Sequence, residues 1–369
     1  MDQKPPVPVL KIPPRSLTLN ALRALAAFLV IVNHTNSALF KASNPSDVTW
    51  WFSMAWYYLS KIAVPLFVMI SGALLLPRRD SYARTVGRAL RVLGALLLFS
   101  YFYYLWNLWQ FHWTWEQALN LPAFLASFWQ KPITDSFWYL YFYLGLMAML
   151  PLLQRLAAAM DKRDLCYLTG CSFLFGSLWP LLTHYVPEMR LPAYLQMPLF
   201  WVFLGLFFAG HYLHSYARPS RGKGWFCLIA IVASVGLSLL LTRLEYTRLN
   251  GMGKYWFMDE RTVPSITIIV CAMAVMFLPR CWAKEERNTR PASPQPFWAR
   301  LLSSLGACAF GVYLLQDWVI AQTKGRIFEP LLGFLHPIPA VLLWEILVYG
   351  VAIGIAWVLS ILPGLKKLL

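Results

Sequence analysis

Residues 17–40 read LTLNALRALAAFLVIVNHTNSALF, an apolar block long enough to cross the hydrocarbon core of a membrane, which takes about 20 helical residues. Further blocks of this kind follow, separated by short polar connections. Of the 369 residues, 59% are hydrophobic and 13% are charged, whereas soluble domains have roughly 45–50% apolar and about 25% charged residues. The sequence therefore predicts an all-α, polytopic membrane bundle of about ten transmembrane helices.

The predicted spans alternate in direction and cover residues 17–40, 52–76, 88–110, 137–158, 165–182, 194–213, 225–243, 264–280, 301–321 and 338–362. With the N-terminus inside, 20 of the 32 Lys and Arg residues fall in cytoplasmic segments or at their borders, and nine fall in external segments. Cytoplasmic loops of membrane proteins carry such an excess. We therefore expect both termini in the cytoplasm, and the net charge of +16 requires no nucleic acid.

The domain organisation follows from these blocks. We expect a cytoplasmic tail over residues 1–16, a single transmembrane domain over residues 17–362 and a short cytoplasmic tail over residues 363–369. Residues 1–16 have no short apolar region of the kind that a cleavable signal needs. All six cysteines lie in or beside apolar blocks, where cysteine behaves as a small hydrophobe, so we expect no disulfide framework and no metal site.

An ionisable side chain at the centre of a bilayer costs at least about 2.5–3.5 kcal/mol, so each one indicates a function. This criterion selects six residues within the spans: Arg23, His34, Lys61, Arg91, Asp317 and Glu345. Arg23 and His34 are eleven residues apart, which places them on one helix face, roughly 16 Å apart along the axis. Both can therefore line one cavity, although a lone membrane histidine can also be a hydrogen-bonded packing residue.

Two further patterns bear on a functional site, although the first by itself indicates only a kinked, tightly packed helix. In the second span, Pro65 frees a backbone carbonyl and Ser71-Gly72 allows another helix or a ligand to approach closely. The third span opens with Arg88 and Arg91, which continue a run of arginines at the predicted cytoplasmic side. This cluster either sets the topology and binds lipid headgroups or binds the phosphates of a ligand.

With these motifs the sequence resembles the acyltransferase-3 family of membrane acyltransferases, and in particular its short members of the enterobacterial common antigen O-acetyltransferase type, which lack a fused periplasmic domain. The resemblance covers residues 17–362. Its most specific parts are the Arg23-to-His34 spacing and the segment KIAVPLFVMISG at residues 61–72. Weaker matches are Arg88-x-x-Arg91, Trp138-Tyr139-Leu140 with Pro151, Leu204-Gly205 and Gly311-Val312-Tyr313-Leu314-Leu315.

The resemblance implies transfer of an acyl group, usually acetyl, from cytoplasmic acyl-coenzyme A to a hydroxyl of a saccharide or lipid-linked glycan at a bacterial inner membrane. No permanently bound cofactor is implied. Carried over residue by residue, His34 is the catalytic base and Arg23, Arg88 and Arg91 bind the donor. The residues implied in substrate binding are Lys61, Ser71, Trp138, Tyr313, Gln316 and Asp317.

The sequence departs from the family pattern at three positions. Asn20 stands where an acidic residue often precedes the motif arginine, which removes an expected ionic partner of Arg23. Gln316, followed by Asp317, stands where a histidine commonly follows the tyrosine motif. Ser136 stands where a histidine often precedes the tryptophan of the fourth span.

Neutral imidazole has a suitable pKa to take a proton from a sugar hydroxyl as it attacks a thioester. An acyl-histidine intermediate is a second route, and the sequence leaves both open. A transporter or flippase of lipid-linked saccharides would also carry charged residues in its spans. Against it, the chain shows no inverted repeat. A polysaccharide polymerase is less expected, because the external loops are short.

Overall fold

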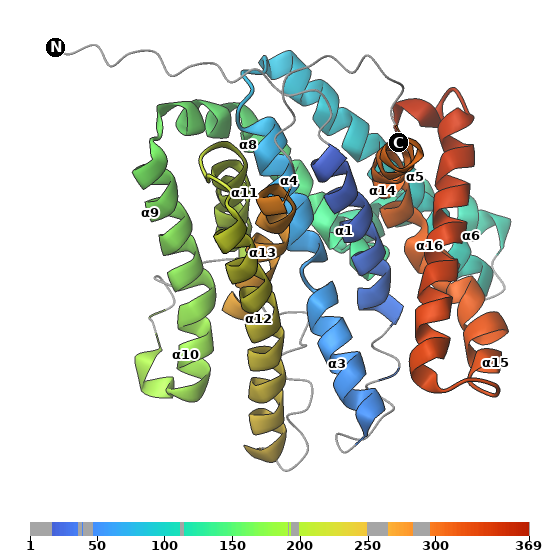
Figure 1. The fold of residues 1–369 in the computed structure, drawn as a ribbon. Helices are drawn as coiled ribbons and strands as arrows, with labels where there is room; N and C mark the ends of the chain where they lie inside the picture. The colour runs from blue at the N-terminus through green and yellow to red at the C-terminus, as the bar shows by residue number, and fades with distance from the viewer. Residues whose placement is uncertain are drawn as a thin grey trace. The chain divides into compact units, whose positions relative to one another are not determined.

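The computed structural model describes residues 17–35, 39, 47–110, 114–190, 192, 199–248, 265–282 and 296–368 (Figure 1). Within these ranges the chain forms helices, turns and short irregular connections, and no strand. The helices are α1 (Leu17–Thr35), α3 (Val48–Ser60), α4 (Ala63–Leu75), α5 (Tyr82–Gln110), α6 (Trp115–Leu119), α7 (Leu121–Gln130), α8 (Trp138–Ala159), α9 (Lys162–Phe173), α10 (Trp179–Tyr185), α11 (Leu199–Ser215), α12 (Arg221–Arg248), α13 (Ile266–Trp282), α14 (Phe297–Thr323), α15 (Glu329–Leu331) and α16 (Pro337–Ile361). The all-α prediction is therefore confirmed.

Eight helical segments of the described chain are long and apolar enough to cross a membrane. They are Leu17–Thr35, Val48–Leu75, Tyr82–Gln110, Asp135–Ala159, Lys162–Tyr185, Arg221–Arg248, Phe297–Leu331 and Pro337–Ile361. The two remaining predicted spans correspond to α11 and α13, which have only 17 residues each. The predicted span over residues 194–213 begins outside the described residues, as does the predicted tail over residues 1–16.

The distribution of polar and apolar side chains on the helix α12 indicates contact with lipid. Its buried side chains include Ser234, Ser238 and Glu245, whereas Val232 is 72% exposed and Ile229 is 65% exposed. A helix at the surface of a soluble protein has the opposite pattern, with apolar residues toward the core. An apolar outer face with polar residues turned inward suits a helix whose outer side contacts hydrocarbon.

The chain divides into two compact units, each built from two stretches of sequence. The first unit comprises Met1–Arg78 and Gln154–Ala307, and the second comprises Arg79–Leu153 and Cys308–Leu369. The first unit contains α1, α3, α4 and α9 to α13, and the second contains α5 to α7, α15, α16 and most of α8 and α14. Two of the three boundaries fall inside α8 and α14, so these two helices contribute to both units.

In the first unit, α4 packs against α1, α11 and α13. The crossing of α4 with α11 depends on two glycines. A Cβ added at Gly72 would lie 1.8 Å from the carbonyl oxygen of Phe207, and one at Gly210 would lie 2.0 Å from the carbonyl oxygen of Met69. Small residues let membrane helices approach at backbone distance, so these glycines fix the position of α4 against α11.

Contacts inside each unit agree with the alternating direction of the spans. In the first unit the Gln154 amide donates to the Leu75 carbonyl at 2.9 Å, between the last turns of α4 and α8. In the second unit the Arg91 guanidinium donates to the Leu368 carbonyl at 3.3 Å, between the start of α5 and the end of the chain. The sequence assigns the two members of each pair to the same side of the membrane.

The connection between the predicted spans 88–110 and 137–158 is largely helical over its described residues, 114–136. It contains α6 and α7, and both begin at a capping side chain. Thr114 and Gln117 form a reciprocal capping box at α6, and the Asn120 side chain accepts from the Ala123 N–H at α7. Such caps satisfy N–H groups that have no partner inside the helix, which allows helices this short to persist.

Candidate functional site

The helix α1 carries Arg23 and His34, and the structure confirms that one continuous helix joins them. It packs against α3, α4 and α13. Ala26, Ala27 and Ile31 between the two residues are fully buried, whereas Arg23 and His34 are half-buried. Alanine brings the neighbouring helices close, and the two ionisable groups lie where α1 is less tightly enclosed.

His34 lies in the last described turn of α1, which ends at Thr35. Thr35 Oγ1 donates to the Ile31 carbonyl at 2.8 Å and thereby satisfies one acceptor at the helix end. The side-chain oxygen of the adjacent Asn33 is buried and has no hydrogen-bond partner among the described residues. A buried acceptor of this kind is costly unless a ligand or water satisfies it, so the end of α1 beside His34 has the character of a binding region. The nearby Asn36 lies outside the described residues.

The second predicted span, residues 52–76, is interrupted near its middle. The structure divides it into α3 and α4, with a turn at Lys61 and Ile62. The physical reason is Pro65, which has no N–H to donate to the Lys61 carbonyl and whose ring crowds the preceding turn. The Leu66 N–H resumes the helical pattern by donating to the Ile62 carbonyl at 2.9 Å.

The interruption places Lys61 between two half-helices. Its ammonium nitrogen lies 4.5 Å from the centre of the Tyr57 ring, a distance at which a cation is attracted to the aromatic face. Broken membrane helices are tolerated where the freed backbone is enclosed by protein or lines a cavity. Ser71, two turns into α4, is half-buried beside the Gly72 crossing. Lys61, Ser71, Arg23 and His34 all belong to the first unit.

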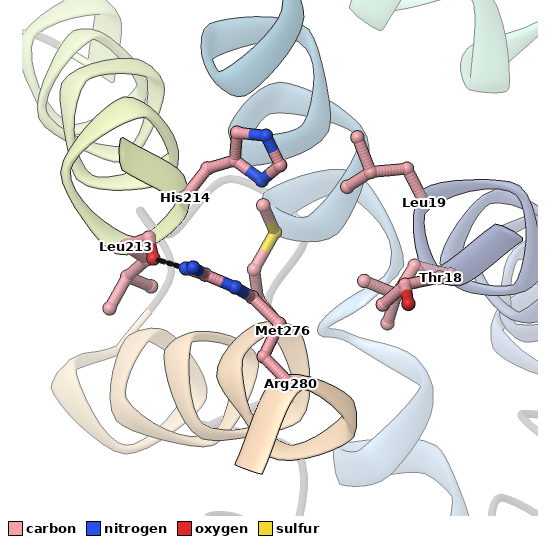
Figure 2. Close-up of a pocket in the computed structure, with 7 residues that line it drawn as sticks. Thr18, Leu19, Leu213, His214, Met276 and Arg280 are labelled. Atoms are coloured by element: carbon pink, nitrogen blue, oxygen red, sulfur yellow. Dashed lines mark hydrogen bonds between the residues drawn. The ribbon is translucent and has the colours of Figure 1, made fainter. Parts of the chain in front are cut away.

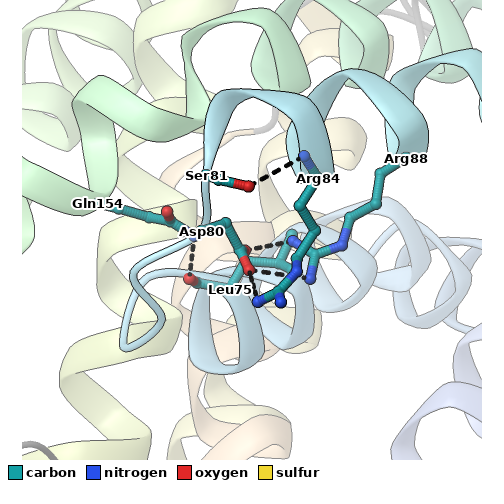
Figure 3. A network of polar contacts seen from close by, with 6 residues as sticks. All are labelled: Leu75, Asp80, Ser81, Arg84, Arg88 and Gln154. Carbon is teal, nitrogen blue, oxygen red and sulfur yellow. Dashed lines mark hydrogen bonds and ion pairs between the residues drawn. The ribbon is translucent and has the colours of Figure 1, made fainter.

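The arginine cluster belongs to the second unit and begins at the start of α5 (Figure 3). Arg88 binds the carboxylate of Asp80 through both terminal nitrogens, and Arg84 contacts the same carboxylate at 3.3 Å. The Asp80 side chain is only 2% exposed. Arg91 instead donates to the Leu368 carbonyl. The sequence does not reveal the role of Asp80, because only the structure shows that Arg88, eight residues later, turns back to it.

The described part of the second unit also assembles a polar cluster around Asp317. One carboxylate oxygen accepts from Thr134 at 2.8 Å and from the Ser136 hydroxyl, and the other accepts from the Gln316 amide at 2.5 Å. Gln316 is fully buried, and its own side-chain oxygen has no hydrogen-bond partner among the described residues. Tyr313 donates to the Ser136 carbonyl. Thus Tyr313, Gln316 and Asp317, three of the residues that the resemblance implies in substrate binding, lie together with Ser136 and Thr134.

Aromatic rings border this cluster. The ring of Tyr139 lies 5.8 Å from that of Tyr313, and the ring of Trp138 lies 6.3 Å from that of Tyr139. Trp138 is 36% exposed and stands at the outer edge of the group. Carboxylate and amide oxygens beside aromatic faces can receive the hydroxyl groups of a ligand and pack against its apolar faces.

Two glutamates are also buried. Glu345, identified from the sequence, is fully buried in α16. Glu245 was overlooked because it lies just past the predicted end of its span, yet it is 1% exposed and lies 3.1 Å from the imidazole of His184. Among the described residues, no three His, Cys, Asp or Glu side chains lie close enough together to hold a metal ion, and all six cysteines are free thiols.

The chain matches a protein family described as an acyltransferase domain, and the match extends over residues 17–361. The match includes α1 with the Arg23-to-His34 spacing, the interrupted α3–α4 segment and the Asp317 cluster. No curated protein matches the chain, and no solved structure does. The family match spans both compact units.

Proposed function

Because the chain belongs to the acyltransferase-3 family, we propose that it is an O-acyltransferase that moves an acetyl group from acyl-coenzyme A to a hydroxyl of a cell-surface or lipid-linked saccharide. That it is a membrane acyltransferase follows from the family match and the eight apolar helical segments. The donor, the acetyl group, the acceptor and the bacterial inner membrane belong to the proposal.

The observation that carries the proposal is the placement of Arg23 and His34 on α1. Both are half-buried on a helix that is otherwise closely packed, and they share one face about 16 Å apart. Ionisable residues inside the spans of membrane proteins commonly mark the path of a substrate or an ion. Acyl-coenzyme A is a long donor with an anionic part and a reactive thioester at its far end. Arg23 is suited to the anionic part, and His34 is suited to the thioester.

His34 supplies the base in this proposal. Its neutral imidazole takes the proton of the acceptor hydroxyl while the oxygen attacks the thioester carbonyl. When the carbon–sulfur bond breaks, the imidazolium returns this proton to the coenzyme A sulfur, so the reaction releases a thiol and needs no other reactant. In the alternative route the imidazole itself attacks the thioester, and the saccharide hydroxyl then removes the acetyl group from it.

The remaining predicted residues fit supporting roles. Arg23 is proposed to bind an anionic or carbonyl group of the donor, and Arg88 and Arg91 keep the donor-binding role expected from the resemblance. Lys61 and Ser71 are proposed to line the path of the substrate along α3 and α4. In the second unit, Asp317 and the free oxygen of Gln316 are proposed acceptors for saccharide hydroxyl groups, since both are acceptor-only oxygens in a buried setting.

A transporter of lipid-linked saccharides is the competing function. The broken α3–α4 segment resembles the discontinuous helices of transporters. Those helices typically occur as a pair in two related halves, and the sequence shows no repeat that would supply the second one. The family match decides in favour of acyl transfer.

The test is incubation of purified protein with radiolabelled acetyl-coenzyme A and a lipid-linked glycan fraction. We expect label in the glycan with the wild-type protein and none with His34→Ala. Movement of unlabelled glycan across the bilayer of proteoliposomes without any acetylation would support the transporter and contradict the proposal.

A further inference from the structure

A pocket of about 140 Å³ lies in the first unit where α1 begins and where α11 and α13 end (Figure 2). It is lined by Thr18, Leu19, Leu22, Leu213, His214, Met276 and Arg280. An apolar cavity of roughly 150 Å³ holds benzene, and one water needs only about 10–15 Å³. The pocket therefore has room for a small group such as a phosphate and not for a whole nucleotide-bearing donor.

The lining carries positive charge without a compensating carboxylate. Arg280 on α13 and His214 on α11 both line the pocket, and its lining residues include no Asp or Glu (Figure 2). One terminal nitrogen of Arg280 donates to the Leu213 carbonyl, which holds the guanidinium at the pocket wall (Figure 2). A guanidinium has five N–H donors, so this bond leaves others for a ligand.

The start of α1 adds to this charge. Thr18 and Leu19 lie in the first turn of that helix, where backbone N–H groups have no partner within the helix and the helix dipole favours an anion. The predicted directions of the spans place the start of α1 and the ends of α11 and α13 on the cytoplasmic side. The pocket thus has a wall that attracts anions. Its predicted location is the cytoplasmic side of the membrane, where acyl-coenzyme A is present.

Arg88 and Arg280 differ in whether a carboxylate already neutralises the charge of the guanidinium. Arg88 in the second unit is bound to Asp80 by both terminal nitrogens, so a phosphate there must compete with a buried carboxylate. The Arg280 pocket has no such competitor among its lining residues. A guanidinium that has no carboxylate beside it binds an anion more readily than one that is already paired.

We infer that the Arg280–His214 pocket binds a phosphate group of the acyl-coenzyme A donor. This inference rests on the proposed function, because it takes acyl-coenzyme A as the donor. Leu22 in the pocket and His34 are twelve residues apart on α1, about 18 Å along the axis. The pantetheine arm is an extended chain between the phosphates and the thioester. In this inference the arm lies along α1, passes Arg23 and brings the thioester to His34.

The experiment measures the dissociation constant of acetyl-coenzyme A by calorimetry, with the full-length protein in nanodiscs of neutral phosphatidylcholine. Arg280→Gln removes the charge and keeps much of the side-chain volume. Hydrogen bonds to charged groups contribute about 1.5–3 kcal/mol, so we expect affinity to fall at least about 10-fold. Arg221→Gln is the matched control, since Arg221 is an exposed arginine at the start of α12 in the same unit, and it should bind with wild-type affinity.

A second variant covers the case in which Arg280→Gln does not fold. Thr18→Trp keeps the charge but fills the pocket from a half-buried position, and it should also weaken acetyl-coenzyme A binding at least about 10-fold. Wild-type affinity in a folded Arg280→Gln or Thr18→Trp protein would overturn the inference. Nanodiscs that contain anionic phosphatidylglycerol test the other source of phosphate. If Arg280→Gln lost only lipid binding, the pocket would be a headgroup site and the inference would be wrong.

The result separates this inference from the proposed function. A wild-type protein that transfers acetyl groups while Arg280→Gln keeps full donor affinity contradicts the pocket alone. A wild-type protein whose binding of acetyl-coenzyme A depends on Arg280, yet which acetylates no saccharide, supports the pocket and contradicts the proposed acceptor. A wild-type protein that does not bind acetyl-coenzyme A contradicts both.

Discussion

The crossing of α4 with α11 should not tolerate a single added methyl group at Gly72. A Cβ there would lie 1.8 Å from the Phe207 carbonyl oxygen, whereas real Cβ atoms essentially never approach a heavy atom within 3.0 Å. The two helices would have to separate locally by at least about 1.2 Å. Because the obstacle is backbone, no change of rotamer relieves it.

We expect Gly72→Ala to lower the free energy of unfolding by about 3 kcal/mol, the upper end of the range for overpacking. Gly236→Ala on α12 is the matched control, because nothing lies within 4 Å of its added Cβ, and it should cause no loss. Unfolding can be followed through the reaction of a thiol dye with Cys271, which is 3% exposed, in a background where it is the only cysteine.

Gly210→Ala repeats the test from the other helix, since its Cβ would lie 2.0 Å from the Met69 carbonyl oxygen. If Gly72→Ala and Gly210→Ala both unfolded at the same denaturant concentration as Gly236→Ala, the close backbone contact would be absent. The placement of the α3–α4 interruption against its neighbours would then be wrong as well.

Three further predictions concern the cluster, the donor and the topology. Asp317→Asn should lower the free energy of unfolding by about 1–3 kcal/mol, because one of the two oxygens that accept hydrogen bonds in the cluster becomes an NH2 donor; an unchanged unfolding midpoint would contradict the cluster. Replacing Arg23, Arg88 or Arg91 with Ala should each weaken acyl-coenzyme A binding more than it reduces expression, and unchanged affinity in all three would leave these arginines with a role in topology only. A reporter fused after Leu369 should be active in the cytoplasm, and activity only in the periplasm would invert the assigned orientation.

Much of the fold could be predicted because membrane helices are encoded locally. A run such as residues 17–40 must satisfy its backbone hydrogen bonds within itself once lipid surrounds it, and the run is visible without any partner. The interruption at Lys61 was only partly visible. Pro65 indicates a disturbed helix, but whether the chain bends or breaks there depends on the helices that pack against it.

The candidate site was predictable to the extent that it lies on one helix. Arg23 and His34 share α1, so their phase follows from 3.6 residues per turn. The hydrogen bond between Ser136 and Asp317 joins residues 181 positions apart, and no local pattern encodes such a contact. The pocket near Arg280 combines three helices from distant parts of the sequence for the same reason.

The central claim is that His34 is the catalytic base, and His34→Gln tests it most directly. Glutamine keeps the approximate size and hydrogen-bonding capacity of histidine but cannot accept a proton at neutral pH. With a defined saccharide acceptor, we predict that kcat falls by about 10²–10⁴-fold, while the unfolding midpoint and the dissociation constant of acetyl-coenzyme A stay near their wild-type values. Wild-type turnover by His34→Gln would show that His34 is a structural residue, and the proposed mechanism would be wrong.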